Sequence, residues 1–190
     1  MIDLRPAAER MAGVAEHVER ADFAAPTPCP DLSVGDLLDH VLILVDVFTG
    51  VAQGRPGAAP PTPPSAANLP EQWRDELRRR LDALVEAWAE PGAWDGTKSV
   101  AGNELPATVA GMVVLDELVV HGWDLAAATG QDYDVSEPEV EAAAGFVSSF
   151  PAPRNGQLFG PVVEVPDDAP PFHRLLGQTG RNPHWRPPAA

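Results

Sequence analysis

Apolar residues recur at three- and four-residue steps in five segments of the chain, a spacing that predicts helices. Two of these segments begin at a clear N-cap. Ser33 and Ser136 are each followed three positions later by an acidic residue, Asp36 and Glu139, which can complete a capping box. The predicted helices cover roughly residues 5–20, 33–51, 70–89, 106–129 and 136–150.

The segments between these helices are rich in proline, which makes up 22 of the 190 residues. The stretch 54–70 is too proline-dense for a helix or a central strand, so it predicts a long crossover between the second and third helices. Residues 151–190 mix proline, glycine and short apolar runs, among which Val162–Val165 is the one candidate strand.

This pattern predicts an all-α fold. We expect an antiparallel four-helix bundle with a long crossover, an extra C-terminal helix and an irregular proline-rich tail. The bundle should occupy residues 1–150, and residues 151–190 should form an extension packed on it. Apolar bundle faces and the tryptophans of the third helix leave room for a homodimer.

The charge balance excludes several functions. With 13 Lys and Arg against 28 Asp and Glu, the net charge is −15, which disfavours nucleic acid and anionic membrane surfaces as partners. No signal peptide and no membrane-length apolar run are visible, so a cytoplasmic location is expected. Cys29 is the single cysteine, so no intrachain disulfide forms. With no histidine beside it in the sequence, Cys29 is expected to be a buried structural thiol.

The candidate chemistry lies in the fourth predicted helix. At 100° per residue, Glu117 and His121 are separated by about 40° around the helix axis, and Asp124 returns to within about 20° of Glu117. The remaining residues around them are almost all apolar, so this stripe is expected to be buried. Buried charge is unfavourable unless it is paired or bound to a metal. These three side chains are therefore expected to contact an oppositely charged group or a metal ion.

A second inward-facing candidate is His40, which shares one face of the second predicted helix with Leu37 and Leu44. Metal sites in helical bundles are built from such inward side chains on facing helices. His40 with Glu117 and His121 would supply two nitrogens and one oxygen. Three protein ligands leave a coordination position for water or substrate, which is typical of a catalytic zinc site.

Other interpretations of the same residues stay open. Glu117 and His121 at four-residue spacing also form an ordinary helix-stabilising pair, and a lone His40 is compatible with a hydrogen-bonded core histidine. In that case the bundle binds no metal, and Glu117 and His121 are neutralised by each other or by an arginine.

Asp124 has three alternative roles. It could pair with an arginine such as Arg174 or Arg181. It could accept a hydrogen bond from the ring nitrogen of a metal-bound histidine and so orient that ligand without touching the metal. It could also close the metal site as a fourth ligand, which would favour a binding protein without turnover.

Two blocks of the sequence resemble the N-terminal domain of mycothiol-dependent maleylpyruvate isomerases, in the DinB-like superfamily of metal-binding four-helix bundles. A third, near the C-terminus, resembles a subfamily of short, largely uncharacterised members, so the resemblance covers nearly the whole chain. The blocks are Thr27–Val34 with Asp36–His40, Asp116–Ala126, and Arg174–Leu176 with Thr179–Trp185.

The resemblance implies a divalent metal, usually zinc, held by His40, Glu117 and His121. Nickel or copper could also load such a site during purification. It further implies a low-molecular-weight thiol such as mycothiol as co-substrate, bound as thiolate and attacking a small-molecule electrophile. The expected function is therefore a thiol S-transferase or isomerase-like enzyme, with a non-catalytic metal-binding or ligand-binding bundle as the alternative. Because characterised isomerases carry a further C-terminal domain, generic thiol transfer is expected ahead of maleylpyruvate isomerisation.

Overall fold

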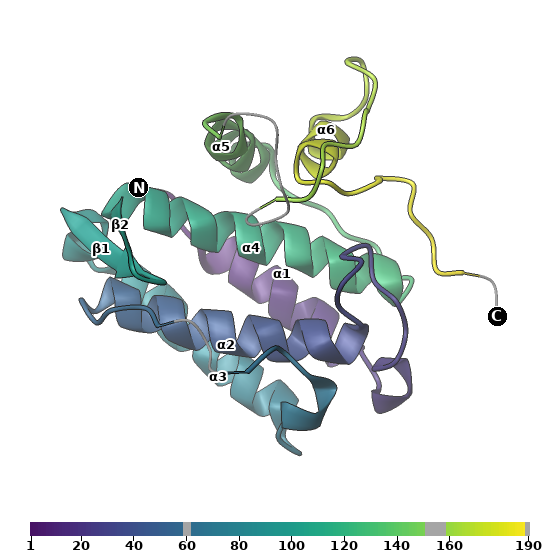
Figure 1. The fold of residues 1–190 in the computed structure, drawn as a ribbon, viewed down its shortest axis with the longest axis horizontal. Coiled ribbons are helices and arrows are strands. Elements are labelled where there is room, and N and C mark those ends of the chain that lie inside the picture. Colours follow the sequence, from purple (N-terminus) through teal and green to yellow (C-terminus); the bar gives the residue numbers. More distant parts are fainter. Residues whose placement is uncertain (59–61, 151–158, 189–190) are drawn as a thin grey trace.

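Four long helices pack into a bundle in the computed structural model, which describes residues 1–58, 62–150 and 159–188 (Figure 1). Helices α1 and α2 each pack against both α3 and α4, which confirms the expected all-α bundle. Within the described residues, three short 3-10 helices cover Arg20–Asp22, Ala66–Asn68 and Pro91–Trp94. The bundle helices are α1 (Arg5–Glu16), α2 (Val34–Ala52), α3 (Trp73–Ala89) and α4 (Ala107–Ala128).

The predicted serine caps are confirmed at two helix starts. The Ser33 hydroxyl donates to Asp36 Oδ2 over 2.6 Å and accepts from the Asp36 backbone N–H. Ser136 makes the corresponding 2.6 Å bond to Glu139 at the start of α5 (Glu137–Ser148). By contrast, α1 ends at Glu16, earlier than its apolar periodicity predicted, because Glu19 and Asp22 form a capping box of their own around a separate 3-10 turn.

The crossover between α2 and α3 is tied to the N-terminal turns of α2. The buried Asp39 carboxylate accepts hydrogen bonds from the Ser65 backbone N–H over 2.9 Å and from Asn68 Nδ2 over 2.8 Å. Asp36 accepts a further bond from the Ala66 backbone N–H. These bonds fix the part of α2 that carries His40.

The structure corrects the prediction of strands. Val162–Val165 forms no strand, and its hydrogen bond runs from the Val163 N–H to the carbonyl of Gly177 at the end of a helix. Instead, β1 (Thr97–Val100) and β2 (Asn103–Pro106) form an antiparallel hairpin in the stretch expected to be a loop. Its two-residue turn has positive φ at Ala101 (49°) and Gly102 (79°). Since that turn usually carries Asn-Gly, the sequence held no clear hairpin signal.

The C-terminal region adds a layer outside the bundle (Figure 1). Helix α5 packs on α4, and α6 (Pro171–Gln178) packs beside α5 and buries Leu175 and Leu176. The α6 segment was expected to be part of an irregular tail, because eight residues give too few periodic positions to predict a helix. The expected domain boundary at residue 150 adjoins residues 151–158, which lie outside the described residues.

Candidate metal centre

Three of the predicted site residues come together between α2 and α4. His40 projects from α2, and Glu117 and His121 project from successive turns of α4. Both histidines direct Nε2 to the same carboxylate oxygen, Glu117 Oε2, which lies 3.4 Å from His40 and 3.0 Å from His121. The two imidazole rings are nearly perpendicular, at 82°, with centroids 5.0 Å apart. The structure therefore brings together the residues that the sequence pattern singled out.

The donor set fits a small divalent cation. One donor atom from each residue lies within 4.8 Å of the other two. With zinc–ligand bonds of about 2.0–2.1 Å, the edges of a coordination tetrahedron measure about 3.3–3.4 Å. The observed separations of 3.0 and 3.4 Å are close to that edge. Two imidazole nitrogens and one carboxylate oxygen are also ligands that zinc commonly takes.

The charges of this cluster are strongly coupled. Burial alone would raise the pKa of Glu117, but hydrogen bonds from His121 and His40 outweigh it and hold that pKa well below its usual range. Burial would lower the pKa of His121, yet hydrogen bonds to Asp124 and Glu117 raise it to about 9. A positive charge is thus favoured between these groups, and a bound cation would supply the same charge.

Asp124 lies on the other side of the His121 ring and is fully buried. Its Oδ2 lies 2.9 Å from His121 Nδ1 and 2.9 Å from Arg181 Nη2, while Arg181 Nε is 3.4 Å from Oδ1. The pairing with Arg181 is one of the expected alternatives. Asp124 is not part of the donor set formed by His40, Glu117 and His121, and it converges instead with His121 and Cys29.

Cys29 also lies close to this region, which its sequence neighbours did not predict. Its Sγ lies within 4.8 Å of donor atoms of both His121 and Asp124, although no histidine is near it in the sequence. Burial is the main reason that the pKa of the thiol is raised, to about 11. The thiol is therefore protonated at neutral pH, which agrees with a structural role and not with that of a nucleophile.

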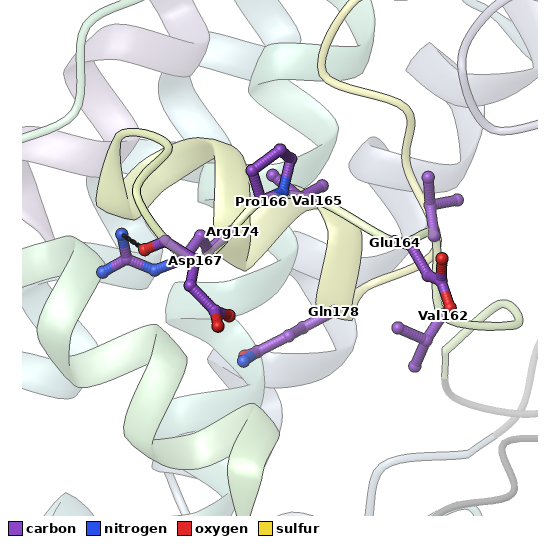
Figure 2. A pocket seen from close by; sticks show the side chains of 8 residues that line it. Val162, Glu164, Val165, Pro166, Asp167, Arg174 and Gln178 are labelled. Carbon is purple, nitrogen blue, oxygen red and sulfur yellow. Dashed lines mark hydrogen bonds between the residues drawn. The ribbon is translucent and has the colours of Figure 1, made fainter.

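A cavity lies elsewhere, near the C-terminal helix. Its volume is about 620 Å³, and it lies between the segment Val162–Asp167 and α6, where Arg174 and Gln178 line it (Figure 2). Arg174 donates from Nη1 to the backbone carbonyls of Asp167 and Ala169, so it holds the adjoining loop and makes no contact with Asp124. The cavity contains none of the converging metal donors, so size alone does not make it the candidate site.

Comparison with known proteins identifies the family. Residues 4–126 match the model of the mycothiol maleylpyruvate isomerase N-terminal domain. The chain belongs to this family. The domain is part of the DinB-like superfamily, and the matched region contains His40, Glu117 and His121 and ends before Arg181.

Relatives of this chain occur in Mycobacterium tuberculosis. Two uncharacterized proteins, Rv0738 of strain H37Rv and MT0763 of strain CDC 1551 / Oshkosh, are each 29% identical to it over 181 residues, 92% of this chain and 93% of theirs. No solved structure matches it. Over the described residues, none of its helices combines the length and apolar character needed to cross a membrane.

Proposed function

We propose that this protein binds a divalent metal, zinc in the first place, through His40, Glu117 and His121. We further propose that it acts with a low-molecular-weight thiol such as mycothiol as an S-transferase or isomerase-like enzyme. The observation that carries the proposal is the convergence of two imidazole nitrogens on one carboxylate oxygen from two different helices. The family match supports the thiol and the reaction type.

Each residue has a distinct part in this scheme. His40 and His121 supply neutral nitrogen ligands, and Glu117 supplies an oxygen ligand and one negative charge. A zinc ion held by these three would keep a coordination position for a thiol and favour its thiolate form. Asp124 accepts from His121 Nδ1 and so keeps Nε2 facing His40 and Glu117. The side chains of His40 and Glu117 keep 30% and 19% of their surface exposed, which leaves the open side accessible to small molecules.

The alternative is a metal-binding or ligand-binding bundle without turnover. Such a site is typically closed by a fourth protein ligand. Asp124 is engaged by Arg181 and by Nδ1 of His121, on the side of that ring opposite to His40 and Glu117, which argues against closure by that residue. We therefore favour the catalytic proposal.

The first test is metal content, measured by inductively coupled plasma mass spectrometry on tag-free protein purified without chelator. We expect about one metal per chain in the wild type and none in a His40→Ala, Glu117→Ala double variant. A His173→Ala, Glu104→Ala double variant removes the same residue types elsewhere and should retain the metal. Absence of metal from the wild type, even after dialysis against zinc, would exclude the proposal.

The second test is turnover. Metal-loaded protein is incubated with mycothiol and chlorodinitrobenzene, or with mycothiol and maleylpyruvate, and conjugation or isomerisation is followed. Thiol-dependent turnover that disappears in the His40→Ala, Glu117→Ala variant supports the enzyme. A protein that binds metal but shows no exchangeable water and no thiol binding on the metal would instead be the binding protein.

A further inference from the structure

Arg181 reaches the metal centre from outside the region that the family model matches. We propose that Arg181 is a positioning residue of this centre: it holds Asp124, Asp124 holds His121, and the C-terminal segment thereby sets the metal affinity of the bundle. The inference rests on the proposed metal site and adds a part of the chain, and a form of regulation, to it.

The buried position of Asp124 makes it depend on neighbouring charged groups. Its carboxylate is 0% exposed, so its charge requires compensation within the protein. His121 donates one hydrogen bond to it, and the Arg181 guanidinium supplies the positive charge and a two-pronged contact through Nη2 and Nε. A planar guanidinium suits this geometry, because its donors match the two carboxylate oxygens. Arg181 thus fixes both the charge and the orientation of the group that orients His121.

The backbone at the end of α6 positions Arg181. Helix α6 ends in a Schellman motif, in which the Gly180 N–H donates to Gly177 and the Arg181 N–H donates to Leu176 over 2.8 Å. Gly180 has a φ of +87°, and a Cβ there would lie 2.8 Å from Gly160 Cα. The side chain is also tethered, since Arg181 Nη1 donates to the Thr179 carbonyl over 2.8 Å. Arg181 is therefore placed by the docked end of α6.

The contacts of Asp124 and Arg181 should affect the affinity of the centre for metal. Groups that hydrogen-bond to a metal-ligating histidine fix its tautomer and orientation, and their loss typically weakens metal binding by about 10–100-fold. If docking of the C-terminal segment strengthens metal binding, metal binding must strengthen docking by the same factor. The centre and the segment that follows α6 are then a coupled pair.

The experiment measures zinc affinity by competition with a fluorescent chelator on the full chain. Arg181→Leu should bind zinc more weakly than the wild type, by no more than the roughly 10–100-fold expected for loss of Asp124 itself. Arg174→Leu is the matched control, because it removes a guanidinium that contacts backbone carbonyls near α6 and does not touch Asp124. It should keep the wild-type affinity. Arg181→Lys, which retains a cation but not the two-pronged contact, should recover part of the loss.

Two further measurements separate positioning from general destabilisation. If Arg181 acts through Asp124, the Asp124→Asn, Arg181→Leu double variant should bind zinc no more weakly than Asp124→Asn alone. At saturating cobalt, the absorption bands of Arg181→Leu should differ from those of the wild type, whereas those of Arg174→Leu should not. In the wild type, saturating zinc should also slow trypsin cleavage after Arg181.

Each outcome is decisive. Equal zinc affinity in the wild type and Arg181→Leu overturns the positioning role and leaves the proposed function standing. A wild-type protein that binds no metal overturns both. If Arg181→Leu does not fold, the decision falls to Arg181→Lys: weakened zinc binding with Arg174→Leu unchanged supports the role, and unchanged binding in both overturns it.

Discussion

His121 Nδ1 lies 2.9 Å from Asp124 Oδ2, while Nε2 of the same ring lies 3.0 Å from Glu117 Oε2. One imidazole thus connects a partly accessible carboxylate to a fully buried one. Because only the Nε2 side meets His40 as well, the two carboxylates should differ in their effect on metal binding.

The first prediction compares the zinc affinity of variants at the ligand His121 and at its partner Asp124. His121→Ala removes a ligand and should abolish stoichiometric zinc binding, whereas Asp124→Asn should only weaken it, by about 10–100-fold. Asp46→Asn, at an exposed position of α2, is the control and should have no effect. Titration against a competing chelator distinguishes the three. Equal loss in His121→Ala and Asp124→Asn would show that Asp124 is itself a ligand.

The second prediction concerns Cys29 in metal-free protein. Because burial raises the pKa of its thiol to about 11, roughly a thousandth of the thiol is ionised at pH 8. The rate of alkylation by iodoacetamide should therefore keep rising up to about pH 11. In urea, the alkylation rate of the same thiol should depend on pH as it does for an unfolded cysteine, with a pKa of about 8.5. A plateau near pH 9 in the folded protein would contradict the raised pKa.

Much of the fold could be predicted because its signals are local. Ser33 and Ser136 begin helices through side chains only three residues away, and the apolar periodicity of the bundle helices extends over several turns. The hairpin was missed because its Ala101-Gly102 turn lacks the usual Asn-Gly. Helix α6 was missed because its stability comes from packing on α5, which no local pattern reports.

Some features of the candidate site could likewise be predicted from the sequence, and others could not. The spacing of Glu117 and His121 on one helix, and the inward position of His40 on another, can be inferred from helical geometry alone. The choice between Arg174 and Arg181 as the partner of Asp124 depends on how α6 docks. Cys29 is near His121 only in space, so a search of sequence neighbours does not find it.

The third prediction concerns the acid stability of the pair formed by Arg10 and Glu139, whose side chains meet at 2.6 Å between α1 and α5. Burial would raise the pKa of Glu139, but hydrogen bonds from Arg10 and Ser136 outweigh it and hold the pKa below its ordinary 4.5. A lowered folded-state pKa stabilises the protein above pH 4.5, and this contribution is lost as the pH falls through the folded-state value.

Glu139→Gln should therefore reduce the free energy of unfolding at pH 7 by about 1.5–3 kcal/mol, the range for hydrogen bonds to charged groups. The difference from the wild type should shrink steadily below pH 4.5, where the wild-type carboxylate takes up a proton. Urea unfolding at several pH values measures it, and Glu137→Gln, in the same turn of α5 but outside the pair, is the control. A difference that stays constant down to pH 3 would mean that the pair contributes no pH-dependent stability.

The last prediction uses two helical glycines with opposite surroundings. A Cβ at Gly111 of α4 would overlap the Trp94 ring, whereas a Cβ at Gly13 of α1 would meet nothing within 4 Å. The Trp94 ring has little freedom to move away, because its Nε1 donates to the Trp88 carbonyl over 2.7 Å and the two indoles pack edge to face. Gly111 must therefore stay small for α4 to pack against Trp94.

Gly111→Ala should lower the free energy of unfolding by about 1–3 kcal/mol, as expected for overpacking. Gly13→Ala should raise it by about 0.5–1 kcal/mol, because alanine is the better helix former and has room there. Urea unfolding of both variants beside the wild type measures whether each substitution raises or lowers the free energy of unfolding. If Gly111→Ala were as stabilising as Gly13→Ala, the Trp94 ring would have to move freely in solution, and its two contacts with Trp88 would not restrain it.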